Sequence, residues 1–475
     1  MSACQTKSRV FALNGTGLLM YRKIVFLALL CMAEPALASD DPFDVEKEVG
    51  PRIEAKACTA ELPDKPLSLS EVIDAALCNN PLTRQSYLSA MAAASQYGEA
   101  KSTYLPTIGL SAGINHSNTN YHRNEDTNSA GADASVSLDW LLFDFGARSA
   151  SVEMMKQALN YALSSRSDVL KTLVFDVTKA YYTLLAAQQG FENSKATVAS
   201  AKSAYEAASK RYELGLAAYS DALQAKTAYA QAQLSEAQAE EALILAQGKL
   251  AVLLNFPPQK GLDLLPVAYS DAQEEEDGKV EDMLQIALEK RSDVMAKRAE
   301  LKQALANVEY EKKQNAPSFS VSAGVTAGDD LKDRGDRNLN TQIGLSMTVP
   351  LFTGFKNTYR ITQSRYLADK TAEELKNLEN EVQTDVWDAF QSYKTAQKSY
   401  KISLVLYASA EQNEKVAMGA YKAGKGSILN VLDAQSKLAD ARTSKSNTFY
   451  EKLIAKSNLI RSMGLINPFE AQKEL

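Results

Sequence analysis

Few side chains in this 475-residue sequence could carry catalysis or bind a metal ion. Its two histidines, His116 and His122, lie in one stretch with Glu125 and Asp126. Imidazole and carboxylate groups so close in sequence could hold a metal ion, although the same stretch, INHSNTNYHRNEDTNSAGAD, has the composition of a plain polar loop. No nucleophile motif, phosphate-binding glycine loop or cysteine cluster accompanies them. The sequence therefore predicts no metal site, no cofactor and a protein that is not an enzyme.

The N-terminus has the features of a secretory signal peptide. From Met20, two basic residues precede a short apolar run at 24–32, and small residues at 36–38 provide a cleavage site. We therefore expect the signal peptide to lie within residues 1–38 and to be cleaved after Ala38, with Met20 rather than Met1 as the start of translation. No later segment is long and apolar enough for a transmembrane helix, so entry into a membrane would require strands.

Two cysteines, Cys58 and Cys78, lie beyond this cleavage site. In an oxidising compartment two cysteines twenty residues apart most simply form a disulfide, which would tie an N-terminal arm at 39–66 to the first short helix. The alternative is a pair of free, buried thiols. A metal site is not favoured, because no histidine lies nearby.

The charge pattern argues against nucleic acid as a partner. The net charge is -6, whereas phosphate binding requires a clustered basic surface. Lys and Arg instead alternate with Asp and Glu along helical segments, as on solvent-facing surfaces.

The chain contains the same unit twice. An offset of 211 residues aligns Pro106 with Pro317, and beyond a variable loop an offset of 209 aligns Gly215 with Gly424. The change in offset falls between the strands of each unit, where a loop tip tolerates length variation. The exported chain then divides into the arm at 39–66, a first repeat at 67–256, an acidic equatorial linker at 257–279, a second repeat at 280–466 and a tail at 467–475.

Long stretches without proline predict very long helices. None occurs between Pro106 and Pro257, so residues 147–212 could form one helix of about 65 residues and about 100 Å. Shorter helices at 82–104 and 219–254 would together nearly match its length. Each repeat is therefore predicted to contain one continuous helix beside one split helix.

A seven-residue apolar repeat marks the later short helix of each unit. Such heptads are typical of a coiled-coil seam, and the small residues among them imply close packing. The positions are Leu223, Ala230, Ala237, Ile244 and Ala251 in the first repeat, and Leu432, Ala439, Ser446, Leu453 and Ile460 in the second.

Four segments change from helical periodicity to alternation of apolar and small polar residues, two in each repeat. A half-buried sheet of a soluble protein would alternate in the same way. The polar face is small and uncharged except for Asp133 and Asp139, which in an exported chain favours a transmembrane β-barrel. The apolar residues that we assign to barrel strands are Ile108, Leu110, Trp140, Phe319, Val321 and Leu345.

Four strands cannot close a barrel, and unpaired strand edges are not tolerated in hydrocarbon. Two copies would give eight strands, whose interior side chains would fill, whereas three copies would give twelve strands and a passage. The sequence therefore predicts a homotrimer in contact with membrane lipid. Its fold class is mainly α, with duplicated units of long coiled-coil helices and two strands that build a 12-stranded transmembrane β-barrel over an α-helical periplasmic tunnel.

An ordered set of motifs resembles the TolC family of trimeric outer-membrane efflux channels over about residues 67–466. The set includes ALCNNP at 76–81, LPTIGLSAG at 105–113, LLFDFG at 141–146, RYELGLAAYSDALQAKTAY at 211–229, PLFTG at 350–354 and YKAGKGSILNVLDAQSKLADAR at 421–442. The resemblance implies a passive duct in the outer membrane, opened by a periplasmic adaptor that an inner-membrane ABC or proton-driven pump holds. The cysteine-bearing arm and the length most resemble the branch that exports cyclolysin-type toxins by type I secretion.

The turns ELGLAAYSD and KAGKGSILN would form the periplasmic tips of the helical hairpins. Gly215 and Gly424 would each stop a helix, and Ser220 and Ser427 could cap the next. The resemblance implies that the adaptor docks on these tips, with Leu216 and Ile428 supplying apolar contact. The implied docking residues are Leu214, Gly215, Leu216, Asp221, Gly424, Lys425, Gly426, Ser427 and Ile428.

The resemblance also implies a gate just inside the tips, closed at rest by inward-coiled helices near 205–221 and 411–430. Its acidic residues would be Glu206, Glu411 and Glu414. Two other protein classes compete with this interpretation: a periplasmic adaptor, and a structural coiled-coil protein. The cargo stays open between toxin, drug, dye and metal, because specificity would lie mainly in the pump.

Overall fold

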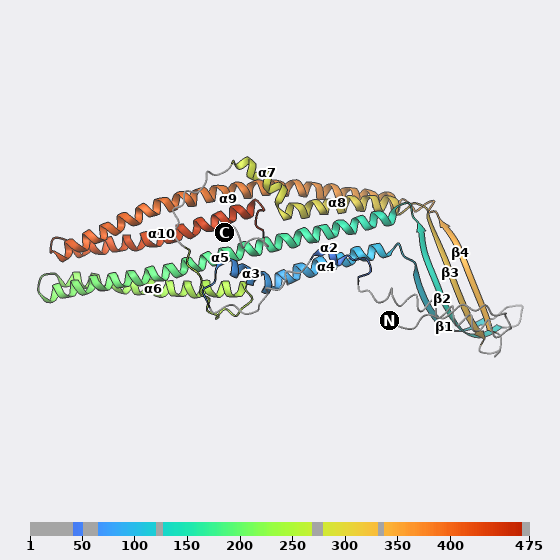
Figure 1. Ribbon diagram of the computed structural model, residues 1–475, viewed down its shortest axis with the longest axis horizontal. Helices are drawn as coiled ribbons and strands as arrows, with labels where there is room; N and C mark the ends of the chain where they lie inside the picture. Colours follow the sequence, from blue (N-terminus) through green and yellow to red (C-terminus); the bar gives the residue numbers. More distant parts are fainter. Residues whose placement is uncertain (1–40, 51–64, 120–126, 268–278, 331–336, 468–475) are drawn as a thin grey trace, which may run out of the picture.

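Two long helical hairpins lie side by side, and a small sheet is attached at one end (Figure 1). The computed structural model describes residues 41–50, 65–119, 127–267, 279–330 and 337–467. The first repeat contains α3 (Leu69–Asn79), α4 (Pro81–Ser102), β1 (Thr107–Thr119), β2 (Thr127–Phe143), α5 (Ala147–Glu213) and α6 (Tyr219–Leu253), preceded by α2 (Glu46–Val49). The second contains α7 (Val280–Lys290), α8 (Ser292–Lys313), β3 (Ser318–Asp330), β4 (Arg337–Thr348), α9 (Lys356–Lys422) and α10 (Ile428–Ser462).

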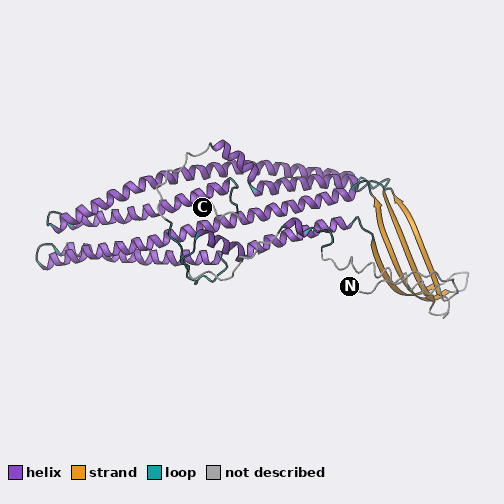
Figure 2. Cartoon of the chain, viewed as in Figure 1, coloured by secondary structure: helices purple, strands orange, loops and turns teal. Residues whose placement is uncertain are grey.

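The two longest helices confirm the prediction drawn from proline spacing. α5 and α9 each run for 67 residues, and Gly190 lies inside α5 without interrupting it. In each repeat a split pair accompanies the long helix: α4 and α6 pack on α5, and α8 and α10 pack on α9 (Figures 1 and 2). Because α5 also contacts both α8 and α10, the repeats pack on each other along their length.

Local sequence explains where the first repeat begins. The Ser68 hydroxyl accepts a hydrogen bond from the Glu71 backbone N–H, and the Glu71 carboxylate accepts one from the Ser68 backbone N–H, which forms a capping box for α3. Asn80 caps α4, whose first residue is Pro81. The sequence therefore separates the short helix α3 from α4 by one extended residue.

The four strands form one antiparallel sheet in the order β1-β2-β3-β4. The register pairs Thr107 with Asp139 and Ser322 with Gly344. Hydroxyls on the polar face join neighbouring strands, as between Ser111 and Ser135 Oγ at 2.7 Å. β1 and β4 form the two edges, which lack partners among the described strands.

The alternation predicted for the strands is present. Ile108, Leu110 and Leu345 are exposed on the apolar face, Trp140 is less exposed, and Phe319 and Val321 are half-buried within the sheet. A soluble domain rarely leaves so many large apolar side chains in contact with water. Among the helices that the structure describes, none is long and apolar enough to cross a membrane.

The largest core cluster lies where α3 packs against the middle of α5. Tyr181 of α5 is buried there, and its hydroxyl donates to the carbonyls of Leu67 and Leu265 at 3.3 and 2.9 Å. A short parallel bridge joins Leu67 to Leu264 at the same level. The segment after α6 is therefore tied to the segment before α3, which fixes the middle of the first repeat.

The heptad predicted in α6 lies away from α5. The side chains that α6 buries are others, including Ala225, Ala232 and Leu250. Leu223, Ala230, Ala237 and Ile244 are exposed, and Ala251 alone of the five is buried. The matching positions of α10 are buried or half-buried, because α10 is flanked by both α9 and α5.

Candidate functional site

The two hairpin tips share one backbone design. α5 ends before Gly215, which has φ +68°, and α9 ends before Gly424, which has φ +75°. The residue after each glycine donates back to the helix, from Leu216 N to Arg211 O at 2.8 Å and from Lys425 N to the Ala420 carbonyl at 2.9 Å. Glycine adopts the left-handed backbone conformation at the lowest energetic cost, and both glycines adopt it directly after a helix. Both predicted helix stops are therefore confirmed.

The helix that follows each tip begins differently in the two repeats. Ser427 caps α10, because its hydroxyl accepts from Asn430 N at 3.3 Å. The corresponding prediction for Ser220 is wrong. Ala218 occupies the cap position of α6, and Ser220 already lies in the first turn, where its hydroxyl lies 3.5 Å from Asp221 Oδ1.

Gly426 allows a close approach of the second tip to its own helix. A Cβ atom there would lie 3.1 Å from the backbone nitrogen of Tyr421 and 3.3 Å from Ala420. A Cβ at Gly424 would lie 3.7 Å from the guanidinium of Arg211. The glycines that sequence reasoning placed at the second tip therefore keep its backbone close to α9 and to the first hairpin.

Arg211 joins the two tips. Its Nη1 donates to the carbonyl of Tyr421 at 2.9 Å, and its guanidinium lies 5.0 Å from the centre of the Tyr421 ring. Around this pair Ala204, Ala208 and Ile428 form a small core shared by both hairpins. The sequence alone assigned no role to Arg211 or Tyr421, although each is the first residue of a motif that contains one of the tips, at 211–229 and 421–442.

The apolar surface of the tips differs from the predicted one. Leu216 is 65% exposed and Leu214 is also exposed, as expected for a contact surface. Ile428 is 1% exposed and packs inside the shared core, so the expectation that it offers an outward apolar contact is corrected. Leu429, its neighbour, is exposed instead.

The acidic residues predicted at a gate are mostly engaged within the chain. Glu411 accepts from the Tyr407 hydroxyl at 2.9 Å and pairs with Lys415 at 3.2 Å. Glu414 accepts from Gln435 at 3.4 Å, whereas Glu206 is exposed on α5. The hydrogen bond from Tyr407 and the charge of Lys415 lower the pKa of the Glu411 carboxyl.

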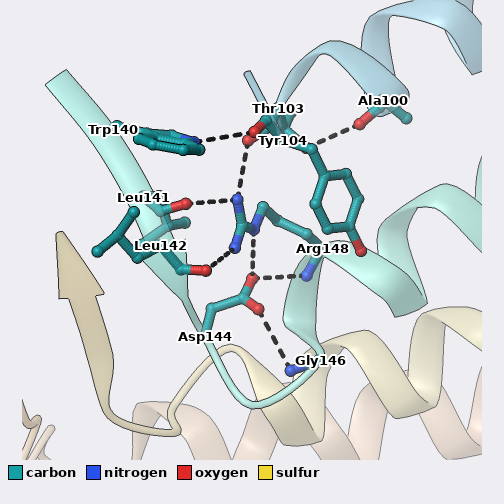
Figure 3. Close-up of polar contacts among 9 residues, drawn as sticks. All are labelled: Ala100, Thr103, Tyr104, Trp140, Leu141, Leu142, Asp144, Gly146 and Arg148. Atoms are coloured by element: carbon teal, nitrogen blue, oxygen red, sulfur yellow. Dashed lines mark hydrogen bonds and ion pairs between the residues drawn. The ribbon is translucent and has the colours of Figure 1, made fainter. Parts of the chain in front are cut away.

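At the other end of the hairpins, Arg148 holds the junction between sheet and helices (Figure 3). Its guanidinium donates to the carbonyls of Leu141 at 2.6 Å, Leu142 at 3.0 Å and Thr103 at 3.2 Å, and to Asp144 Oδ2 at 3.2 Å. One side chain thus joins the ends of α4 and β2 to the start of α5. The second repeat has Asn357 at the equivalent position, so only the first repeat carries this cation.

Nearby, the Trp140 ring contributes to the same junction. Its Nε1 donates to the carbonyl of Tyr104 at 3.0 Å, and the Tyr104 ring lies 4.6 Å from the Arg148 guanidinium (Figure 3). Trp140, selected from the sequence as a strand residue, therefore also links β2 to the end of α4.

A polar cavity of about 220 Å³ lies where α5 meets the second repeat. Lys171 lines it and donates to the carbonyls of Lys290 at 3.3 Å and Gly464 at 3.0 Å, which are at the ends of α7 and α10. Burial, with the nearby charge of Asp293, raises the pKa of the Asp168 carboxyl on the same wall. The cavity belongs to the packing between repeats and lies far along α5 from the tips.

The cysteine and histidine predictions are tested only in part. Cys78, in α3, is disulfide-bonded, whereas Cys58 lies outside the described residues, so their pairing stays a prediction. His116 is exposed near the end of β1, and His122, Glu125 and Asp126 lie outside the described residues. In the described part of the chain no group of three potential metal ligands occurs.

A duplicated unit of 67-residue helices with strands at one end and paired turns at the other is the architecture of a membrane-attached channel. Residues 72–255 and 283–465 match the model of a family described as "Outer membrane efflux protein". The chain belongs to this family. It is an outer-membrane efflux channel with a periplasmic helical extension, and it is a transport protein and not an enzyme.

Individual relatives agree with this assignment. The chain is 29% identical over 378 residues to Protein CyaE of Bordetella pertussis, which covers 79% of each sequence. It is 25% identical over 415 residues to Outer membrane protein TolC of Escherichia coli, covering 84% of this chain and 83% of that protein. Among solved structures, the outer-membrane channel OprN is similar with a TM-score of 0.74 at 20% identity, over 83% of this chain and 89% of that one.

Proposed function

We propose that three copies of the chain form a water-filled duct from the periplasm to the cell exterior. The observation that carries this proposal is the four-stranded sheet with an exposed apolar face and two edges, β1 and β4, that lack partners in the described chain. In lipid such edges must pair, and three sheets give a closed barrel of twelve strands with room for a passage.

The duct would serve a tripartite export system. Leu214 and Leu216 expose apolar surface at the first tip, at the far end of the hairpins from the sheet, where a periplasmic adaptor could reach them (Figure 1). The adaptor would in turn be held by an inner-membrane ABC or proton-driven pump that supplies the energy. The channel itself performs no chemistry.

The resting duct would be closed at the tips. The contact of Arg211 with Tyr421 holds the two hairpins of one chain together at the position proposed for the gate. An adaptor would open the duct by binding better to a state in which the tips have moved apart. Glu206 is the exposed acid among the three proposed gate residues, since Glu411 and Glu414 have partners within the chain.

For the cargo we propose polypeptide export by type I secretion, with drug efflux as the second candidate. Similarity to Protein CyaE of Bordetella pertussis supports the first, and the efflux family as a whole supports the second. Deleting the gene and measuring both secreted protein and drug susceptibility separates them. Loss of one secreted polypeptide without a change in susceptibility supports secretion, whereas the reverse result supports drug efflux.

Reconstitution tests the duct directly. Protein purified from outer membranes in detergent is expected to insert into a planar lipid bilayer and give discrete conductance steps, small in the wild type because its tips are closed at rest and larger once the tips are loosened. A trimer that never conducts, even when its tips are loosened by Arg211→Ala, would refute the proposed duct.

A further inference from the structure

The two faces of the sheet differ in the charges that they carry. Asp133 and Asp139, both on β2, lie on the polar face, where the register pairs Asp139 with Ser322. The basic residues of the described strands are His116 and Arg337, and the register places both on the apolar face. Within the described strands the polar face therefore carries acidic residues and no Lys, Arg or His.

The surroundings of Asp133 leave its carboxylate open. Its register partners on β1 and β3 are Gly113 and Gly328, so neither contributes a side chain beside it. A Cβ atom at Gly113 would lie 3.3 Å from Asp133 Oδ1, because the carboxylate extends across the space that a side chain there would take. Asn115 Nδ2 donates to the same oxygen at 3.0 Å and holds the carboxylate in this position.

Asp139 lies closer to the helices, six residues further along β2. It is exposed, and its register partners, Thr107 and Ser322, are small. Six residues of strand extend over about 20 Å, which is about twice the Debye length in 0.1 M salt. The two carboxylates therefore lie at two separate heights of the sheet and act on ions independently of each other.

Hydroxyl groups make up much of the remaining polar face. The hydroxyls of Ser111 and Ser135 lie 2.7 Å apart, and those of Ser320 and Ser346 lie 2.8 Å apart. Hydroxyls bind water and carry no net charge, so they leave the sign of the electric field at this face to the carboxylates.

We propose that Asp133 and Asp139 form two rings of fixed negative charge inside the barrel, which concentrate small cations and deplete small anions where the duct crosses the membrane. The proposal rests on the assembly proposed above, in which three copies turn their polar faces towards the passage. Each residue then occurs three times around the axis. The rings lie in the sheet, at the opposite end of the hairpins from the tips, so they select ions separately from the proposed gate (Figure 1).

The size of the effect follows from the dimensions of the barrel. Twelve strands about 4.8 Å apart place the wall roughly 10 Å from the axis. In 0.1 M salt, three carboxylates at that distance should raise the concentration of a monovalent cation on the axis about twofold and lower that of an anion by a similar factor. In 1 M salt the Debye length is about 3 Å, so the selectivity due to the rings should nearly disappear.

The reversal potential across a planar bilayer, under a gradient of potassium chloride, measures this selectivity. All measurements use Arg211→Ala as the background, so that the tips are loosened and the acids near them contribute equally throughout. Adding Asp133→Asn and Asp139→Asn together should lower the permeability ratio of K⁺ to Cl⁻ at least about twofold in 0.1 M salt.

A cysteine at one ring separates the effect of charge from that of shape. Asp139→Cys should lower the permeability ratio, a methanethiosulfonate that carries a sulfonate should restore it, and one that carries a trimethylammonium group should lower it further. Leu138→Cys is the matched control, because the neighbouring residue lies on the opposite face of β2. Neither reagent should change its permeability ratio.

Three results would contradict the proposal. An unchanged permeability ratio in the double variant, in a protein that conducts and has the mass of a trimer, would overturn the rings and leave the proposed duct standing. Equal responses of Asp139→Cys and Leu138→Cys to the two reagents would overturn the assignment of the polar face to the passage. A protein that never conducts would overturn the duct and the rings with it.

Discussion

Arg211, in the last turn of α5, donates a 2.9 Å hydrogen bond to the backbone carbonyl of Tyr421, in the last turn of α9. The contact joins equivalent ends of the two repeats, although Ala420 occupies the position that corresponds to Arg211 in the second repeat. Within the described structure the buried Arg211 Nε and the Tyr421 hydroxyl have no hydrogen-bond partner. Burial also raises the pKa of the Tyr421 hydroxyl. A buried polar group without a hydrogen-bond partner costs folding free energy. The contact between Arg211 and Tyr421 is therefore easier to break than one in which every buried polar atom is hydrogen-bonded.

Arg211→Ala should therefore loosen the tips while leaving the trimer assembled. It removes the hydrogen bond to Tyr421 and the contact with its ring, so we expect a larger mean conductance in planar bilayers than for the wild type. Lys210→Ala, one residue earlier on an exposed side chain, is the control and should not change conductance. An unchanged conductance in Arg211→Ala would show that this contact does not restrict the passage.

Arg148→Ala should destabilise the junction between sheet and helices. The carbonyls of Leu141, Leu142 and Thr103 lose their donor, and Asp144 loses its ion pair, so we expect a cost on the order of 2–4 kcal/mol in the free energy of unfolding. Thermal unfolding followed by circular dichroism measures it. Lys356→Ala, at the start of α9 in the second repeat, is the exposed control and is expected to lie within about 0.5 kcal/mol of the wild type.

The capping box of α3 should make stability depend on pH in the acid range. The hydrogen bond from Lys65, with those from the Ser68 backbone and hydroxyl, lowers the pKa of the Glu71 carboxyl to about 2 from its ordinary value of 4.5. A folded-state pKa below the unfolded one stabilises the fold above about pH 4.5, and the contribution is lost as the pH falls from 4.5 towards 2.

Glu71→Gln is the variant that tests this. At pH 7 it should lower the melting temperature, because the capping interaction contributes about 1 kcal/mol to the free energy of unfolding. The difference in melting temperature from the wild type should shrink as the pH falls from 4.5 towards 2. Glu281→Gln, on the exposed first turn of α7, should show no such trend. A difference that is constant between pH 7 and pH 2 would contradict the assignment.

Leu216→Asp should weaken docking of the periplasmic adaptor. It places a charge in the exposed apolar surface of the first tip, so we expect docking to weaken about tenfold and export to fall with it, as for loss of an apolar anchor worth about 1.4 kcal/mol. Export of the cargo and co-purification of the adaptor measure the effect. Gln224→Asp, exposed in the second turn of α6, adds the same charge and should leave both unchanged.

Much of the fold follows from the sequence. The absence of proline from 107 to 256 and the alternation at 107–114 predict α5 and β1, because helix breakers and side-chain period act locally. Gly215 and Gly424 likewise mark the tips, since few other residues adopt a left-handed conformation at low cost.

The remaining features depend on contacts between distant segments. Ile428 lies in a tip motif, yet its burial depends on α5 residues more than 200 positions earlier. Arg148 and Arg211 act through backbone carbonyls, which have no sequence signature. The heptad of α6 was evident in the sequence, but which side of the helix the chain itself covers could be seen only in the structure.

The mass of the protein in the outer membrane tests the proposed duct most directly. The mature chain is extracted in detergent from isolated outer membranes, and its protein mass is determined by light scattering with correction for bound detergent. We predict a mass of three chains and recovery in the outer-membrane fraction. A monomer recovered in the soluble periplasmic fraction would contradict both the barrel and the tunnel.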